Sequence, residues 1–222
     1  MRFEAIAARL EPLPDPLPSP LDALMPVRTD GGTWRFPGAG APPGGRPAAV
    51  LVLLYPDDAA DARVVLIERP TVDGRHHSGE VSFPGGKAEP DDADAVATAL
   101  REAAEEVGLD AQAADVRVVG VLDRLWIPVS DFAVTPVVAL APRRPELVAA
   151  PAEVVRIVEP PVTMFLPDAP LGVVERTVRG WPIRYGHYEV DGLSVWGATA
   201  RILSQLGAVI AGAAVASERP TA

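Results

Sequence analysis

The 222-residue chain contains no cysteine. Disulfide bonds, thiolate metal sites and cysteine nucleophiles are therefore excluded, and any chemistry must use oxygen and nitrogen atoms. Positive charge is also scarce, because 20 Lys and Arg stand against 30 Asp and Glu and give a formal net charge of −10. A chain with this balance repels long polyanions, so we expect no nucleic-acid partner.

Long apolar runs are missing as well. The longest ones, residues 48–55 and 206–216, fall short of the roughly 20 residues that a membrane-spanning helix needs. The first residues lack the apolar core of a signal peptide, and the last residues do not form a peroxisomal address. We therefore expect a cytoplasmic protein that makes no membrane contact.

The residues that are present predict one main domain with short extensions, since 48% of them are hydrophobic and can fill a substantial core. Residues 2–11 have apolar side chains at helical spacing, and the proline-rich residues 12–20 predict an extended connector. Residues 36–45, rich in Gly and Pro, predict the last loop before the core. We therefore divide the chain into a lead-in (1–45), a main domain (46–210) and a flexible tail (211–222).

Strand and helix patterns are interleaved within the domain. Strands are expected at residues 48–55, 64–67, 79–83, 116–122, 132–140 and 154–158, and a hairpin at 173–178 and 183–190. Helices are expected at residues 94–107 and from 199 onward. This order predicts an α/β (α+β) fold in which a mixed β-sheet is sandwiched between α-helices.

The helix expected at residues 94–107 has an unusual concentration of charge. Glu102, Glu105 and Glu106 fall at i, i+3 and i+4, so three carboxylates share one face. Like charges at this spacing destabilise a helix, and Mg²⁺ prefers carboxylate oxygens, so a bound metal ion would stabilise the arrangement. Arg101 lies one turn before Glu105 and can brace a carboxylate. For the glutamates alone, a solvated acidic helix face is the alternative.

The flanks of this helix favour the metal-site interpretation. Gly85 and Gly86 form a glycine turn that permits a close backbone approach to an anion or a metal ion. Gly108 predicts a left-handed C-cap, and Asp92 predicts an N-cap, with a place beside the metal site as the alternative for Asp92. The opposite helix face can dock on a sheet through Ala95, Val96, Ala99, Leu100, Ala103 and Val107.

Counted from Gly86, the pattern is G-x5-D-x8-R-E-x2-E-E-x-G-L. It resembles the box of the Nudix hydrolases, G-x5-E-x7-R-E-U-x-E-E-x-G-U, where U is a bulky aliphatic residue. Asp92 with one extra residue after it, and Ala103 in place of U, depart from the general box. The segment from Leu66 to Lys87 is similar to the one that marks the coenzyme A pyrophosphatase branch, which typically also has the Asp and the longer spacing.

The resemblance implies a Nudix fold and a metal-dependent hydrolysis. The substrate implied is coenzyme A or an acyl-CoA, cleaved at its diphosphate to 4′-phosphopantetheine (or its acyl form) and adenosine 3′,5′-bisphosphate with Mg²⁺ or Mn²⁺. Glu102, Glu105 and Glu106 would bind metal together with the carbonyl oxygen of Gly85, and Arg101 would orient them. Two alternatives stay open: a pyrophosphatase for ADP-ribose, NADH or another nucleoside diphosphate derivative, and a non-catalytic nucleotide sensor.

Two further glutamates are candidates for catalysis outside the helix. Glu153, where a strand meets a loop, and Glu80 are candidates for the general base or a further metal ligand, and a plain surface glutamate is the alternative. Trp126 and Phe132 are candidates for stacking on adenine or lining a pantetheine groove, with core packing as the alternative.

Basic residues near the box are candidates for binding the substrate phosphates. Arg69, Arg75 and Lys87 supply the positive charge, and His76 and His77 are candidate hydrogen-bond donors. Simple solvent exposure is the alternative for each of them. The expected partner is thus a small-molecule substrate, and whether the chain forms a homodimer stays open.

Overall fold

The computed structural model describes residues 1–31, 45–71, 80–127, 130–178 and 180–212. Its central sheet is mixed, because β2 pairs in parallel with β9 and antiparallel with β3 and β6, while β7 and β8 pair antiparallel with β9. The strands of this sheet are β2 (Arg46–Pro56), β3 (Ala62–Val64), β6 (Gly85–Lys87), β7 (Arg117–Val121), β8 (Leu125–Ile127) and β9 (Phe132–Leu140).

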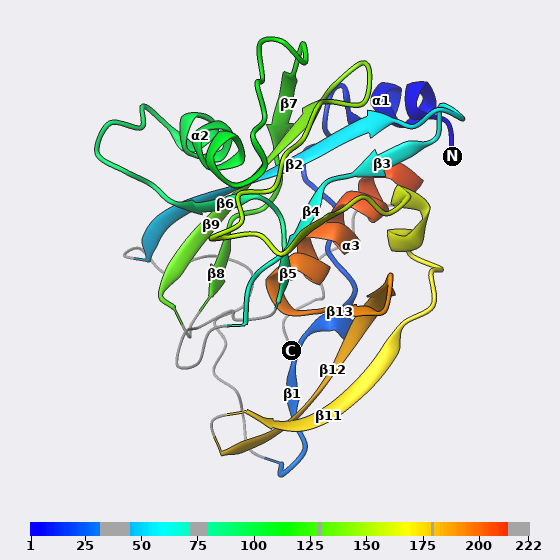
Figure 1. Cartoon of the computed structure of the whole chain (residues 1–222). Coiled ribbons are helices and arrows are strands. Elements are labelled where there is room, and N and C mark those ends of the chain that lie inside the picture. The colour runs from blue at the N-terminus through cyan, green and yellow to red at the C-terminus, as the bar shows by residue number, and fades with distance from the viewer. Residues whose placement is uncertain (32–44, 72–79, 128–129, 179, 213–222) are drawn as a thin grey trace.

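Helices cover both faces of this sheet (Figure 1). Alternate residues of β2 point to opposite sides: Val52 and Leu54 lie in one core cluster, and Leu51 and Leu53 lie in the other. The first cluster includes side chains of α1 (Phe3–Leu10) and α3 (Gly197–Ala211), and the second includes those of α2 (Ala95–Val107). The predicted mixed sheet sandwiched between helices is therefore confirmed.

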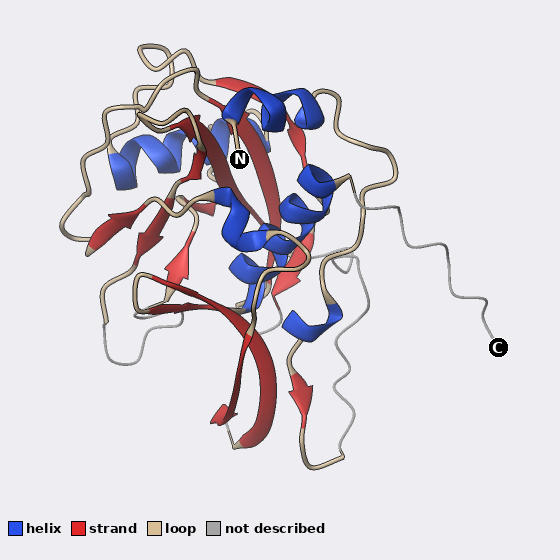
Figure 2. Ribbon diagram, turned by 90° about the vertical axis from the view of Figure 1, so that its right-hand side faces the viewer, coloured by secondary structure: helices blue, strands red, loops and turns tan. Residues whose placement is uncertain are grey.

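Two smaller sheets complete the fold. One has the order β10–β4–β5, and the other pairs β1 and β11 with the two sides of β12, which also pairs with β13. The curved β11–β12 hairpin extends away from the central sheet (Figures 1 and 2). The elements are β1 (Val27–Arg28), β4 (Leu66–Glu68), β5 (Val81–Ser82), β10 (Arg156–Val158), β11 (Gly172–Val178), β12 (Trp181–Val190) and β13 (Leu193–Val195), with short 3-10 helices at Asp22–Leu24 and Val162–Phe165.

Several expected elements are confirmed, namely the N-terminal helix, the strand at 132–140, the hairpin and the last helix. The single strand expected at residues 64–67 was wrong. It is two strands, because the chain leaves the central sheet at Val65 so that β4 can pair with β10 and β5. The short strands β1, β8 and β13 were not predicted, since two or three residues have no readable periodicity.

The lead-in segment contributes to the same core as the domain. Phe3, Ile6 and Leu10 of α1 are buried in the cluster that contains the apolar side chains of α3. The predicted loop at residues 36–45 lies, except for Gly45, outside the described residues, and the predicted tail lies outside them from residue 213 onward. In the described part of the chain, none of the helices has both the length and the apolar character to cross a bilayer.

Candidate active site

The two glycines before the acidic helix lie in a strand rather than in the expected turn. Gly85 pairs with Val50 and Gly86 with Ala49, so β6 pairs with β2, and it also contacts helix α2. A Cβ on Gly85, whose φ is +153°, would come within 2.6 Å of the Val50 Cα, and one on Gly86 within 2.6 Å of the Glu102 carboxyl carbon. The fold therefore requires glycine at position 85, where main chain lies too close for a Cβ, and at position 86 a Cβ would displace the Glu102 carboxylate.

Helix α2 begins and ends at clear capping residues. The Asp94 side chain caps the N-terminus by accepting a hydrogen bond from the Ala97 N–H at 2.8 Å, and Gly108 ends the helix in the left-handed region at φ 64°. The C-cap prediction is confirmed. The assignment of the N-cap to Asp92 was wrong, because Asp92 lies before the helix start and its carboxylate turns toward Arg101.

Arg101 organises the acidic face of the helix. Its guanidinium donates to both oxygens of Asp92, at 3.0 and 2.9 Å, and to the carbonyl oxygen of Lys87 at 3.0 Å. It also donates to Glu102 and Glu105, each at 3.1 Å, so the expected bracing is confirmed. These hydrogen bonds hold the pKa of Asp92 well below its usual range, and the pair therefore stays charged.

Glu106 is the most buried of the three glutamates, with 1% of the residue exposed. One carboxylate oxygen accepts from the Arg69 guanidinium at 2.7 Å, and the other accepts from the Gly85 N–H at 2.9 Å. Arg69 also donates to the Gly85 carbonyl oxygen at 2.9 Å and to the Ser82 hydroxyl at 3.1 Å. Arg69, expected to bind substrate, is thus held on the oxygens that were assigned to the metal.

Burial also shifts the proton equilibria of this face. Desolvation raises the pKa of Glu106 to about 7, although Arg69 and the Gly85 N–H act in the opposite direction. The charges of Glu102 and Glu153 raise it further. Desolvation likewise raises the pKa of Glu102, against the effect of Arg101. An added cation would favour the ionised form of both carboxyls.

The donor set fits a hard divalent cation. Glu102, Glu105, Glu106 and the Gly85 carbonyl all offer oxygen, and a cationic group, the Arg69 guanidinium, already bridges Glu106 and Gly85. Among the described residues, no group of three acidic or histidine side chains lies close enough together to hold a metal ion. Arg69 is ion-paired with Glu106, and Arg101 is ion-paired with Glu102 and Glu105.

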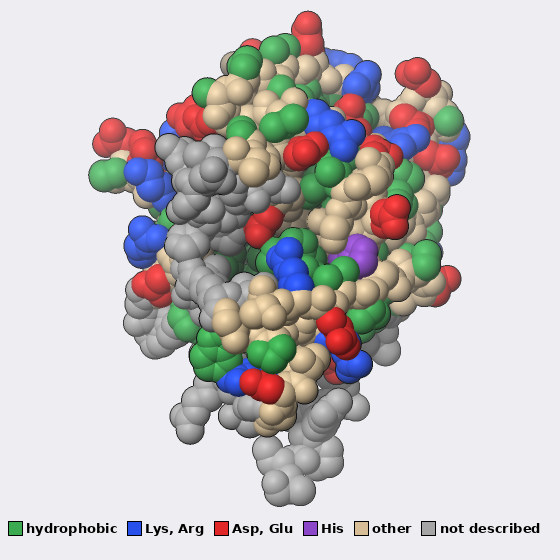
Figure 3. Space-filling view, turned by 60° about the horizontal axis from the view of Figure 1, so that its bottom comes forward, with side chains coloured by type: hydrophobic (Ala, Val, Ile, Leu, Met, Phe, Trp, Pro, Cys, Tyr) green, Lys and Arg blue, Asp and Glu red, His purple; other side chains and the backbone are tan. Residues whose placement is uncertain are grey.

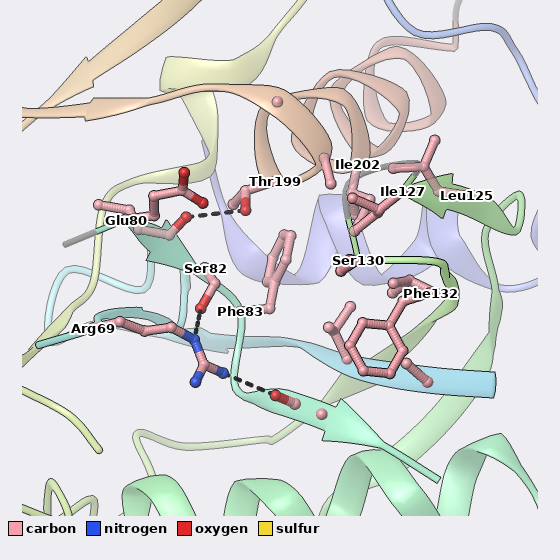
Figure 4. Close-up of a pocket in the computed structure, with 18 of the residues that line it drawn as sticks. Arg69, Glu80, Ser82, Phe83, Leu125, Ile127, Ser130, Phe132, Thr199 and Ile202 are labelled. Carbon is pink, nitrogen blue, oxygen red and sulfur yellow. Dashed lines mark hydrogen bonds between the residues drawn. The ribbon is translucent and has the colours of Figure 1, made fainter. Parts of the chain in front are cut away.

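The site opens into a cavity of about 750 Å³. Figure 3 shows the hollow on this face, where hydrophobic side chains lie beside both acidic and basic ones. In Figure 4, Arg69 lies on one side of the cavity, and Leu125, Ile127 and Ile202 lie on the other. The carboxylates of α2 and this apolar wall therefore face a common space.

Most of the other predicted site residues also line this cavity. Glu80 and the exposed Glu153 do so, and so do the half-buried Trp126 and Phe132. Lys87 lines it as well, with 67% of its side chain exposed and its ammonium 3.8 Å from Glu89. Arg75, His76 and His77 lie outside the described residues. The structure thus gathers the other five predicted residues around one cavity, and their individual roles stay predictions.

Sequence reasoning did not find two arginines that line the cavity. Arg176 on β11 lies over the rings of Trp196, at 4.5 Å, and Tyr185, at 5.3 Å. Arg201 on α3 lines the same cavity. A signal for Arg201 was present, because it is the sole charged residue in the helix Gly197–Ala211.

Comparisons with known proteins agree with this geometry. A family model described as NUDIX domain matches residues 45–161. The Arabidopsis thaliana protein "Nudix hydrolase 15, mitochondrial" is 39% identical over 181 residues, which cover 79% of this chain and 60% of that protein. The "Uncharacterized Nudix hydrolase NudL" of Photorhabdus laumondii is 38% identical over 161 residues, covering 72% and 83%.

The same fold occurs among solved structures. The crystal structure of the Nudix hydrolase RenU from M. smegmatis superposes with a TM-score of 0.52 and 19% identity, covering 86% of this chain and 97% of that one. Nudix hydrolases generally use divalent metal ions such as Mg²⁺ or Mn²⁺, which suits the oxygen donors of α2 and β6. By its matching domain model, its sequence relatives and its fold, the chain belongs to the Nudix hydrolase family.

Proposed function

We propose that this chain hydrolyses the diphosphate bond of coenzyme A or an acyl-CoA, with Mg²⁺ or Mn²⁺. The products are 4′-phosphopantetheine, or its acyl form, and adenosine 3′,5′-bisphosphate. The segment from Leu66 to Lys87 supports this choice of substrate, and the box from Gly86 to Leu109 supports the reaction.

The observation that carries the proposal is the shared cavity. Its volume of about 750 Å³ suits a large, extended substrate rather than a bare diphosphate. The diphosphate binds on the side of the cavity that carries the α2 carboxylates, while Leu125, Ile127 and Phe132 offer an apolar surface to the pantetheine or acyl part. A substrate with an anionic centre and a less polar end therefore matches a cavity with one charged side and one apolar side.

In the proposed mechanism the acidic helix would hold the metal ion. Glu102, Glu105, Glu106 and the Gly85 carbonyl would be its ligands, and Arg101 keeps the helix carboxylates in place through its anchor on Asp92. When bound, the ion would neutralise charge on the phosphate oxygens and lower the pKa of a bound water. Glu153 and Glu80, on the cavity wall, are the candidate bases that accept the proton of the attacking water.

A substrate panel tests the proposal. The purified protein is incubated with Mg²⁺ or Mn²⁺ and with coenzyme A, acetyl-CoA, ADP-ribose or NADH, and the products are separated by chromatography. We expect the highest kcat/KM for coenzyme A or its acyl form. The variant Glu105→Gln should lose this activity, while Glu146→Gln, which alters an exposed glutamate away from the cavity, should keep it.

Two outcomes would replace the proposal. Equal or faster turnover of ADP-ribose or NADH would make the chain a pyrophosphatase for another nucleoside diphosphate derivative. Binding of coenzyme A without product formation, with either metal present, would make it a nucleotide sensor.

A further inference from the structure

Arg201 is an unusual residue for the place it occupies. Helix α3 is buried almost all round, with eleven of its residues from Thr199 to Ile210 in the interior. Such a helix is normally apolar on every face, and a charge within it is costly unless a partner compensates for it. Arg201 is the one charged residue of this helix.

No partner compensates for this charge among the described residues. The Arg201 Nε is buried and has no hydrogen bond, and no carboxylate lies within ion-pair distance of the guanidinium. Burial lowers the pKa of Arg201, with no opposing contribution from an acidic neighbour. Arg69 and Arg101, by contrast, are paired with carboxylates, and Arg176 lies exposed over aromatic rings.

The surroundings of Arg201 form part of the cavity wall. Gly197, Ala198 and Thr199, the first turn of α3, line the cavity together with Arg201. No side chain caps this helix start, and no acidic residue lies in its first turn. The partial positive charge of a helix N-terminus therefore adds to the guanidinium charge on the same wall.

We propose that Arg201, with the first turn of α3, binds a phosphate monoester of the substrate that is separate from the scissile diphosphate. This inference rests on the proposed function and deepens it, because it names the feature by which the site selects its substrate. The planar guanidinium fork matches phosphate oxygens, and the anion supplies the partner that the described residues do not. On coenzyme A, this group is the 3′-phosphate.

Kinetics with a matched substrate pair test the inference. Coenzyme A and 3′-dephospho-coenzyme A differ only in this phosphate, and both are assayed with the parent, Arg201→Gln and Arg184→Gln. The last variant removes an exposed arginine outside the cavity and controls for net charge. We expect Arg201→Gln to raise KM for coenzyme A roughly tenfold to a hundredfold, as loss of a charge-assisted hydrogen bond implies, and to leave the dephospho substrate unchanged. An equal loss on both substrates overturns the inference.

Binding without turnover separates this inference from the proposed reaction. Calorimetry in a metal chelator compares adenosine 3′,5′-bisphosphate with adenosine 5′-monophosphate. The parent and Arg184→Gln should prefer the bisphosphate, and Arg201→Gln should not. If coenzyme A is not hydrolysed but the parent prefers the bisphosphate, the proposed reaction is wrong and the phosphate site is supported. If coenzyme A is hydrolysed but the parent shows no preference for the bisphosphate, the proposed phosphate site is wrong.

Thermal unfolding distinguishes a binding role from a structural one. Since Arg201 is partly buried and its Nε has no hydrogen-bond partner among the described residues, Arg201→Met should raise the Tm of the ligand-free protein. Adenosine 3′,5′-bisphosphate should raise the Tm of the parent more than that of this variant. A lower Tm for the ligand-free variant would mean that Arg201 supports the fold, and would contradict the inference.

Discussion

The buried carboxyl of Glu106 makes the stability of the metal-free protein depend on pH. In the folded protein its pKa is raised from 4.5 to about 7 because burial disfavours the charged form. Between these two pH values the folded chain binds more protons at this site than the unfolded chain does. The contribution of Glu106 to stability is therefore fully present below pH 4.5 and is lost as the pH rises through about 7.

The size of this effect follows from the shift. The rise of the Glu106 pKa from 4.5 to about 7 corresponds to ~3 kcal/mol of unfolding free energy lost as the pH increases between these values. Glu106→Gln has no proton to lose, so its stability should lack this component. The amide also places a donor against either the Arg69 guanidinium or the Gly85 N–H, which costs about 1–3 kcal/mol at every pH.

Urea unfolding in a metal chelator measures both effects. The unfolding free energy of the parent minus that of Glu106→Gln should fall by ~3 kcal/mol from pH 4.5 to pH 8. Glu105→Gln is the matched control, because the Glu105 side chain is 56% exposed, and its curve should run parallel to that of the parent. If the Glu106→Gln curve also runs parallel to the parent, the carboxyl is not desolvated as described.

Further predictions concern the glycines, the central arginine and the metal. Gly85→Ala should lower the unfolding free energy in urea by ~3 kcal/mol or more, because its Cβ would meet the β2 backbone. Gly86→Ala should change the unfolding free energy by no more than ~1 kcal/mol. It should lower kcat/KM about a hundredfold, because its Cβ would displace the Glu102 carboxylate. Arg101→Lys should lower stability by ~2 kcal/mol and reduce kcat, since lysine cannot keep both bonds to Asp92; unchanged urea curves would refute this. A chelator should abolish turnover, and Mg²⁺ at a hundred times its Kd should raise the unfolding free energy by about 2.7 kcal/mol; no metal-dependent shift would contradict the metal site.

The larger elements of the fold were predictable because their patterns are long. Val137 to Leu140 forms a continuous apolar run, and the predicted strand has the bounds of β9. The break at Val65 was not predictable, because it depends on which strands β3 and β4 find as partners. Pairing between distant segments leaves no local pattern in so short a run.

The candidate site was predictable where residues lie close in sequence. Glu102, Glu105 and Glu106 follow from helical spacing alone. Their different environments, exposed for Glu105 and buried for Glu106, depend on contacts with Arg69, which follows β4, and with Gly85 of β6. They could not be read from spacing. Arg201 comes from a helix about a hundred residues away along the chain, and only the fold brings it to the cavity.

The adjacent glycines of β6 are under different selective pressures, which are folding at position 85 and catalysis at position 86. The contact behind Gly85 is main chain, which cannot move aside, whereas the contact in front of Gly86 is the mobile end of an acidic side chain. A lineage that no longer needs catalysis can therefore replace Gly86 and still fold, but it must keep Gly85. In descendants of this protein, the residue at position 86 would report whether catalysis has been retained, and the residue at position 85 would report only that the chain folds.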